Sequence, residues 1–316
     1  MILAELNWGL LDQQLINGIQ LGAIYALIAL GYTMVYGVLK LINFAHGEVY
    51  MVGAYVAYYI AEQWLDKNAV SPWVMLALML FGAMVVCAIL GVTIERLAYR
   101  PLRGAPRISV LITAIGVSLL IQQGGLLILR TSPQPSISQQ VNPFGVSNFT
   151  GIPVLGDLTI SWAQTAMFGV SIVLMLFLWW FVSGSKTGRA MRAVSHDFST
   201  ASLMGINVNR IVSITFIIGS ALAGAGGMMN ATALGTPLDT FYGLMPGVKA
   251  FVAAVLGGIG NIPGAVVGGF LMGIAETLVI WMGYSNYKDA VAFVILIAIL
   301  LVKPSGLLGS VGQEKA

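Results

Sequence analysis

Long apolar segments, separated by short polar clusters, follow one another along almost the whole chain. A membrane-spanning α-helix needs about 20 apolar residues, so each such segment is a candidate span. The second and seventh candidates have only about 16 residues and adjoin breaks that contain Gly or Asn, so either is expected to be broken or re-entrant. The pattern predicts an all-α, polytopic membrane protein with about eight or nine membrane helices in a single domain, 1–316. The candidate spans are 15–38, 48–63, 72–94, 108–129, 162–183, 211–232, 244–259, 262–283 and 289–303.

The composition supports this fold class and excludes a water-soluble globular protein. Of the 316 residues, 58% are hydrophobic and only 9% are charged, and the mean hydropathy is +0.89. That leaves too little polar surface to cover a soluble domain. The 38 glycines allow close approach of helix backbones in lipid, where no hydrophobic drive brings helices together. The single cysteine, Cys87, cannot form an intramolecular disulfide, and redox chemistry is not indicated.

Lysine and arginine are distributed unevenly between the two sides that alternating spans would create. The positive-inside rule places the richer side in the cytoplasm. The N-terminus is then outside, the C-terminus is cytoplasmic, 131–161 is an extracytoplasmic loop and 184–210 is a cytoplasmic loop. Some strand structure is expected in the outer loop around Val154 and over Leu158 to Ile160. The residues predicted inside are Lys40, Arg96, Arg100, Arg103, Arg107, Lys186, Arg189, Arg192, Arg210, Lys303 and Lys315, and those predicted outside are Lys67, Arg130 and Lys288.

A polar hexapeptide, NFAHGE, separates the first two apolar segments at positions 43–48. Polar and charged groups at membrane depth are costly, which makes each of them a candidate for function. Asn43, His46 and Glu48 are consistent with a helix start that faces a translocation pathway. They are equally consistent with a structural role, in which Asn43 caps a helix and Glu48 lies in its first turn, where the helix dipole favours an acid.

Glu276 lies deep in the eighth apolar segment and requires a partner. Lys249, within the seventh segment, is a candidate for that partner. A buried structural pair would explain both residues without any transport chemistry. A place on the translocation pathway is the alternative interpretation of Glu276.

The glycine-rich run GGIGNIPGAVVGG at 257–269 indicates a turn between two close-packed helices, with Gly264 and Gly268 at small-xxx-small spacing. It lacks the Lys and Ser/Thr of a phosphate-binding loop. The two histidines, His46 and His196, lie on unlike segments, so no catalytic or metal-ligand constellation emerges. We expect no catalytic residue, no metal site and no enzymatic activity of this chain alone.

Residues 186–207 form a polar, helix-prone island in the apolar chain. An amphipathic element on the cytoplasmic side is a means by which a soluble partner could move the membrane domain. Ala190, Val194, Asp197 and Ala201 are spaced by four, three and four residues, so they are predicted to share one helical face suited to a groove on that partner.

Several strings together resemble the LivH-type permease of bacterial branched-chain amino-acid ABC importers. The resemblance extends over almost the whole chain, and its motifs are long, ordered and spread over several predicted helices. The strings are YALIALGYTMVYG (25–37), NFAHGE (43–48), IERLAYRP (94–101), the island through Gly205, and KAF (249–251) followed by the glycine-rich run.

The resemblance implies a multi-pass subunit in the bacterial inner (cytoplasmic) membrane that works with several partners. These are a second, LivM-type permease, two cytoplasmic ATPases that bind ATP and magnesium, and an extracytoplasmic protein that delivers leucine, isoleucine or valine. The chain itself would bind no cofactor and no nucleic acid. The island would be the coupling loop that contacts an ATPase. The implied coupling residues are Arg189, Arg192, Val194, Asp197, Ala201 and Gly205, and the candidate pathway residues are Asn43, His46, Glu48 and Glu276.

The island also departs from the general importer signature, which begins Glu-Ala-Ala. This chain has Ser199, Thr200 and Ala201 there, and His196 stands where the family favours an acid, so the docking contacts are left open. Two alternative functions are also left open. A related permease could import urea or short amides. A stand-alone channel or ion-coupled carrier could use Glu48 and Glu276 at the midplane, but it would leave the island unexplained.

Overall fold

The computed structural model describes residues 10–64, 70–128, 152–153, 159–233 and 237–309, and nearly all of them are helical. The only strands in these ranges form a two-stranded antiparallel ribbon that pairs Ile152 with Ile160 and Pro153 with Thr159. The predicted strand at Leu158 to Ile160 is therefore found at Thr159–Ile160, whereas Val154 and most of 131–161 lie outside the described residues. The elements are α1 (Leu11–Leu39), α2 (His46–Tyr59), η3 (Ile60–Trp64), α3 (Pro72–Ile94), η4 (Glu95–Tyr99), η5 (Arg100–Leu102), α4 (Arg107–Ile128), β1 (Ile152–Pro153), β2 (Thr159–Ile160), α6 (Trp162–Gly184), α7 (Lys186–His196), α8 (Phe198–Leu203), α9 (Val208–Ala233), α10 (Leu244–Gly257), α11 (Ile262–Trp281), η7 (Ser285–Tyr287) and α12 (Ala290–Val302).

Six helices in the described residues are long and apolar enough to cross a membrane, which makes the chain a multi-pass membrane protein. They correspond to α1, α3, α4, α6, α9 and α11. The second and seventh predicted spans are short, as expected, because α2 and α10 have 14 residues each. The sequence did not indicate that α12 would also be short, with 13 residues.

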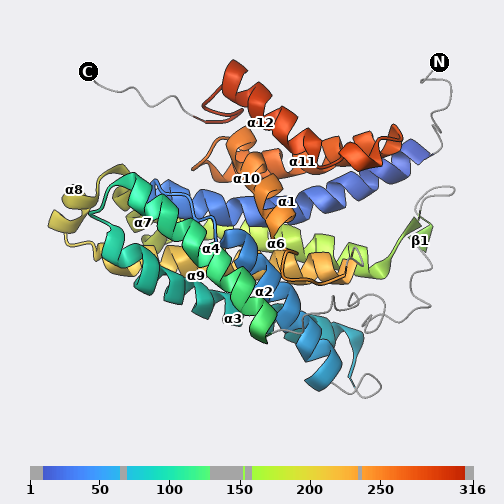
Figure 1. Ribbon diagram of the computed structural model, residues 1–316, viewed down its shortest axis with the longest axis horizontal. Helices are drawn as coiled ribbons and strands as arrows, with labels where there is room; N and C mark the ends of the chain where they lie inside the picture. The colour runs from blue at the N-terminus through green and yellow to red at the C-terminus, as the bar shows by residue number, and fades with distance from the viewer. Residues whose placement is uncertain (1–9, 65–69, 129–151, 154–158, 234–236, 310–316) are drawn as a thin grey trace.

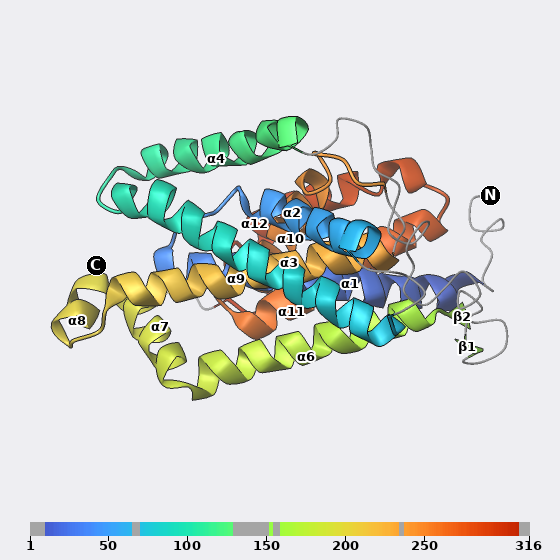
Figure 2. The ribbon, with the colours of Figure 1, turned by 90° about the horizontal axis from the view of Figure 1, so that it is seen from below.

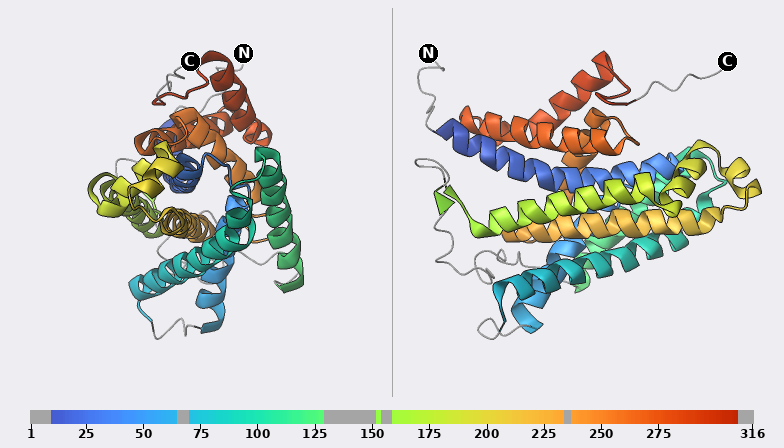
Figure 3. Two further views of the ribbon diagram at one scale, coloured as in Figure 1. Left: turned by 90° about the vertical axis from the view of Figure 1, so that its left-hand side faces the viewer. Right: turned by 180° about the vertical axis from the view of Figure 1, so that it is seen from behind.

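The centre of the bundle is formed by α1 and α9, which most other helices contact (Figures 1 and 3). The close packing of α1 on α11 depends on small residues: a Cβ added at Gly22 or at Gly273 would overlap the backbone of the opposite helix. The outer helices α3, α4, α6 and α12 expose large apolar side chains, as helices do that face lipid or another membrane protein.

The helices run between two ends of the molecule, which we call the β1–β2 end and the α7–α8 end (Figure 2). The first turn of α1 lies at the β1–β2 end, and the last turns of α1, α6 and α12 lie at the α7–α8 end. The α7–α8 end gathers the basic positions, whereas Lys288 lies at the other end beside the first turns of α1 and α6. The basic positions of the α7–α8 end are Lys40, Arg96, Arg100, Arg103, Arg107, Lys186, Arg189, Arg192, Arg210 and Lys303, while Lys67, Arg130 and Lys315 lie outside the described residues.

Two short helices begin inside the bundle instead of at one of its ends. The ring of His46, the first residue of α2, packs against Gly31, which lies eight residues before the end of α1, or about 12 Å along that helix. The start of α10 meets the start of α2, because a Cβ added at Gly47 would lie 2.6 Å from the carbonyl oxygen of Gly243. Glycine at both positions is what allows the two helix starts to touch.

The glycine-rich run 257–269 forms the predicted turn between close-packed helices. α10 ends at Gly257 and α11 begins at Ile262. Cβ atoms added at Gly264 and Gly268 would overlap the carbonyl oxygens of Gly257 and Ala253 on α10, so both glycines lie at the helix contact.

Candidate functional site

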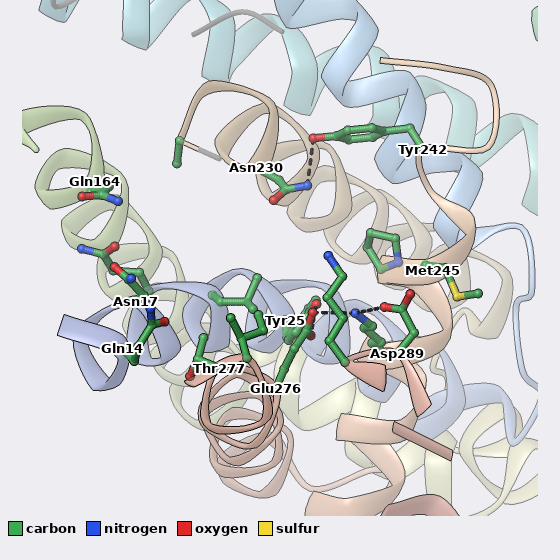
Figure 4. A pocket seen from close by; sticks show the side chains of 17 residues that line it. Gln14, Asn17, Tyr25, Gln164, Asn230, Tyr242, Met245, Glu276, Thr277 and Asp289 are labelled. Atoms are coloured by element: carbon green, nitrogen blue, oxygen red, sulfur yellow. Dashed lines mark hydrogen bonds and ion pairs between the residues drawn. The ribbon is translucent and has the colours of Figure 1, made fainter. Parts of the chain in front are cut away.

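A polar cavity of about 620 Å³ lies toward the β1–β2 end, between α1, α6, α9, α10 and α11 (Figure 4). Its size is within the range of about 300–1,000 Å³ that is usual for small-molecule sites. The lining combines charged groups, side-chain amides and an apolar wall. The lining residues are Gln14, Asn17, Gln20, Leu21, Tyr25, Gln164, Asn230, Ala233, Tyr242, Met245, Pro246, Lys249, Glu276, Thr277, Ile280, Lys288 and Asp289.

A network of buried charges forms one side of this cavity (Figure 4). Lys249 Nζ donates to Glu276 Oε1 at 2.7 Å and lies 2.6 Å from Asp289 Oδ1. Tyr25 OH donates to the other oxygen of Glu276, Oε2, at 2.7 Å. The predicted pairing of Glu276 with Lys249 is therefore confirmed, and the structure adds Asp289 and Tyr25, which the sequence analysis missed.

The members of this network differ in their exposure. The side chains of Lys249 and Glu276 are only 6% and 5% exposed, whereas that of Asp289 is 41% exposed. A charge buried in a membrane helix is tolerated when it is paired and hydrogen-bonded, which accounts for Lys249 and Glu276. Asp289 is the carboxylate of this network that a ligand in the cavity can reach.

An aromatic and amide wall lies on another side of the cavity. Asn230 Nδ2 on α9 donates to Tyr242 OH at 2.8 Å, and the ring of Tyr242 stacks on that of Tyr50 from α2 with centroids 5.6 Å apart. This wall connects α9 and the start of α10 to α2. The cavity therefore lies next to the place where the two short helices, α2 and α10, begin.

The three other candidate pathway residues lie away from this cavity, around the start of α2. Asn43 Oδ1 accepts from the backbone N–H of Ala45 at 3.2 Å and from Tyr99 OH at 3.1 Å. The N-cap position of α2 is Ala45, so the prediction that Asn43 caps the helix is wrong by two residues. Asn43 instead fixes the loop before α2, because a side-chain oxygen that accepts from the backbone two residues later forms a local turn.

His46 and Glu48 are both buried in the first turn of α2. The His46 ring lies 4.6 Å from the ring of Tyr32 on α1, and the Glu48 carboxylate interacts with Ser118 on α4. Neither residue lines the cavity described above. Of the four candidate pathway residues, the structure thus brings only Glu276 to the cavity, and a pathway role for Asn43, His46 and Glu48 stays a prediction.

A second candidate region is the polar island, which forms two helices instead of one. The chain is extended at Asp197, with φ −155° and ψ 120°, between the end of α7 and the start of α8. The prediction that Ala190, Val194, Asp197 and Ala201 share one helical face is therefore wrong. Asp197 is the N-cap of α8: its Oδ1 accepts from the backbone N–H of Thr200 at 2.8 Å and from the hydroxyl of Ser199 at 2.7 Å. These hydrogen bonds, that from the Thr200 N–H above all, lower the pKa of Asp197.

The two arginines of α7 contact the end of α6. Arg192 donates from Nη1 to the carbonyl oxygen of Val182 and from Nη2 to that of Ser183 at 3.4 Å, while Arg189 Nη1 donates to that of Gly184 at 3.2 Å. The last carbonyls of a helix lack intrahelical partners, and a cation there also matches the helix dipole. Arg189 and Arg192 thus hold the angle between α6 and α7, a contact that the sequence analysis did not anticipate.

The remaining coupling candidates are Val194, Ala201 and Gly205, and the side chains of the first two are buried. Val194 and Ala201 are 0% and 4% exposed, packed inside this chain, so neither offers its side chain to a partner. Leu203 and Met204, at the end of α8, are 88% and 78% exposed. Gly205 follows with φ 82°, and its neighbour Ile206 donates a backbone hydrogen bond to Ala201, an arrangement that ends a helix and favours glycine. The exposed apolar tip at Leu203 and Met204 was missed because its two residues have no periodic pattern.

A buried acid connects the segment after α3 to α9. Glu95, fully buried in the π-helical turn η4, pairs with Arg103 and accepts from the hydroxyl of Ser213 on α9 at 2.9 Å. Arg103 also donates to Asn209, in the first turn of α9. This cluster fixes the start of α9 directly after the α7–α8 loop. Within the described residues, no three His, Cys, Asp or Glu side chains gather in a way that could hold a metal ion.

Comparison with known proteins shows the family of this chain. Residues 14–300 match the family model described as "Branched-chain amino acid transport system / permease component". The chain is 43% identical over 310 residues to the high-affinity branched-chain amino acid transport system permease protein LivH of Escherichia coli K12, covering 96% of this chain and 97% of that protein. It is 43% identical over 306 residues to BraD of Pseudomonas aeruginosa, with 96% and 97% covered, and 30% identical over 304 residues to a probable LivH of Methanocaldococcus jannaschii, with 90% and 88% covered. The chain therefore belongs to the family of permease components of branched-chain amino acid transport systems.

Proposed function

We propose that this chain is the membrane-spanning permease subunit of an ATP-driven importer and forms a translocation pathway for leucine, isoleucine and valine. The observation that carries the proposal is the family match over 14–300 together with 43% identity to two permeases named for high-affinity branched-chain amino acid transport. These names favour branched-chain amino acids over urea or short amides. The cavity with its paired charges and apolar wall is consistent with that substrate class.

The partners follow from this role. A second, LivM-type permease would complete the membrane domain, an extracytoplasmic protein would deliver the amino acid, and two ATPases would bind ATP and magnesium. The chain itself would bind no cofactor and carry out no hydrolysis. The exposed tip at Leu203 and Met204 supports docking of a soluble subunit, because large apolar side chains that protrude from a polar loop are typical of interfaces.

The orientation follows from the basic residues at the α7–α8 end, which the positive-inside rule assigns to the cytoplasm of a bacterial inner membrane. The start of α1 and the cavity would then face outward. A membrane-impermeant thiol reagent tests this orientation, because the single native cysteine, Cys87, is buried. A cysteine at Lys186 should react only when the reagent is inside, and one at Lys288 only when it is outside. The reverse pattern would overturn the orientation.

Reconstitution in proteoliposomes tests the function. With both permeases, the ATPases and the delivery protein present, leucine uptake should require ATP, and a non-hydrolysable ATP analogue should abolish it. Liposomes that contain only this chain should take up neither leucine nor ions. ATP-independent flux through the chain alone would favour the channel or carrier, and ATP-driven uptake of urea but not of leucine would favour the amide importer.

A further inference from the structure

We propose that the cavity is a binding site for the zwitterionic head of an amino acid, with Asp289 receiving the α-ammonium group and Lys288 the α-carboxylate. This inference rests on the proposed function and adds the chemistry by which the permease itself recognises its substrate. Nothing in the family match assigns either residue.

The charged network in the cavity wall is not electrically balanced. Lys249 contributes one positive charge to the buried network, and Glu276 and Asp289 contribute two negative charges, so the network carries one net negative charge. Tyr25 OH satisfies the second oxygen of Glu276 with a hydrogen bond. The unneutralised charge is therefore accessible at Asp289, whose side chain is 41% exposed. An ammonium group on a ligand would neutralise it.

A second cation, Lys288, lies next to Asp289 in the sequence. Lys288 lines the same cavity, directly before Asp289 in the sequence, and forms no salt bridge with any residue in the described part of the chain. Adjacent residues thus present one positive and one negative group to the same space. An α-amino acid carries both an ammonium and a carboxylate group, so it can pair with both of these side chains at once. An amine or a carboxylic acid alone would leave one of them unpaired, which is how a site of paired charges discriminates.

The rest of the cavity lining is apolar or neutral. Leu21, Met245, Pro246 and Ile280 give the cavity an apolar wall from α1, α10 and α11, which suits an aliphatic side chain. Side-chain amides, among them Gln14 on α1 and Gln164 on α6, supply hydrogen bonds without adding charge (Figure 4). Lys249, Glu276 and Tyr25 are positioning residues here. Lys249 contacts Asp289, Glu276 accepts from Lys249, and Tyr25 donates to Glu276, so the network orients Asp289 through contacts within the protein.

A cysteine reporter tests the inference in the complete importer. In the Asn17→Cys variant, a membrane-impermeant methanethiosulfonate should label the cavity from outside, and the parent with only the buried Cys87 supplies the background. Leucine should slow labelling, whereas 4-methylpentanoate, which lacks the ammonium group, and 3-methylbutylamine, which lacks the carboxylate, should need at least about tenfold higher concentrations for equal protection. Equal protection by all three compounds would overturn the inference.

Substitution of the charged pair then assigns the two roles. Asp289→Asn and Lys288→Met, each in the reporter background, should raise the leucine concentration for half-protection by at least about tenfold. Asp289→Glu should recover part of the protection. Asp239→Asn is the matched control, because Asp239 is exposed before α10 outside the cavity lining and asparagine can still accept from the N–H of Phe241. A thermal melt of each assembled complex establishes that the variant is folded. Unchanged protection in both Asp289→Asn and Lys288→Met would overturn the inference.

The same preparation separates this inference from the proposed function. ATP-driven leucine uptake by the parent importer without any protection of Asn17→Cys would overturn the cavity site and leave the proposed function intact. Protection by leucine in an importer that does not transport leucine would support the site and overturn the proposed function.

Discussion

At the β1–β2 end, Lys249, Glu276 and Asp289 are in direct contact along one side of a cavity, whereas at the α7–α8 end Arg189 and Arg192 donate to the last carbonyls of α6. The first arrangement leaves a carboxylate within reach of a ligand. In the second arrangement both arginines are bound to backbone carbonyls of the same chain, and the apolar side chains of Leu203 and Met204 are highly exposed at the tip. The comparison teaches that a network of paired charges can leave one carboxylate, that of Asp289, accessible from a cavity, whereas the charges of Arg189 and Arg192 serve to orient the helix that leads to the exposed tip.

The largest expected effect is at Lys249. Lys249→Met leaves Glu276 and Asp289 without their cation, and the loss of one partner from a buried pair costs about 3–5 kcal/mol. We expect a marked fall in the melting temperature of the detergent-solubilised protein. Combining it with Glu276→Gln, which removes one of the stranded charges, should restore part of the loss. An unchanged melting temperature for Lys249→Met would show that the network does not stabilise the fold.

Two glutamate substitutions in α8 compare a buried position, Ala201, with an exposed one, Leu203. Ala201→Glu places a charge among buried side chains and should destabilise the chain by about 1–3 kcal/mol. Leu203→Glu changes a fully accessible site and should alter stability by less than about 0.5 kcal/mol, but it should reduce co-purification of the ATPases. Melting curves and pull-down yields measure the two effects. If Leu203→Glu binds the ATPases as well as the parent does, the exposed tip is not the docking surface.

A smaller effect is expected at Gly205, which ends α8 with φ 82°. A β-branched residue resists this conformation, so Gly205→Val should cost about 1–2 kcal/mol. Asparagine adopts it more readily, so Gly205→Asn is the matched control and should cost less. Protease sensitivity of the α7–α8 loop measures the difference, and equal sensitivity of the two variants would contradict the assigned role of the backbone.

The smallest effect is the pH dependence of the α8 cap. Hydrogen bonds from Thr200 and Ser199 lower the pKa of Asp197 in the folded state. The stabilisation is therefore fully present above the unfolded pKa of an aspartate and is lost as the pH falls through the lower, folded value. Hydrogen exchange of the α8 amides, corrected for intrinsic rates, should quicken in acid. The Asp197→Asn variant should lack this pH dependence, and an identical profile in both proteins would exclude the cap as its source.

The sequence predicts the structural features that depend on a local pattern of residues. It does not predict contacts between distant segments, or the outcome where one segment matches two different patterns. The length of the apolar segments was enough to predict the main helices, and the cost of a buried charge was enough to predict the pairing of Glu276 with Lys249. Asp289 was missed because it is the first residue of the candidate span 289–303, at the edge of the membrane, where an acid needs no partner. Its place in the network depends on how α12 returns to α10.

The error at Asp197 has a different cause. Helical spacing was applied across it, although an aspartate followed by Ser199 and Thr200 is also a helix-start signal. The roles of Arg189 and Arg192 could not be predicted either, because they depend on the angle between α6 and α7, which their own positions in the sequence do not encode.

We propose that the β1–β2 end binds the amino acid and that the α7–α8 end docks the ATPases. The most direct test of these two roles is the number of leucine molecules imported per ATP hydrolysed in the reconstituted importer. The Asp289→Asn variant should keep ATP hydrolysis stimulated by the delivery protein and import fewer leucine molecules per ATP. The Leu203→Glu variant should lose hydrolysis and uptake together, because the ATPases no longer engage the chain. If the ratio is unchanged in Asp289→Asn, or if Leu203→Glu hydrolyses ATP and imports leucine as the parent does, the account of the two ends is contradicted.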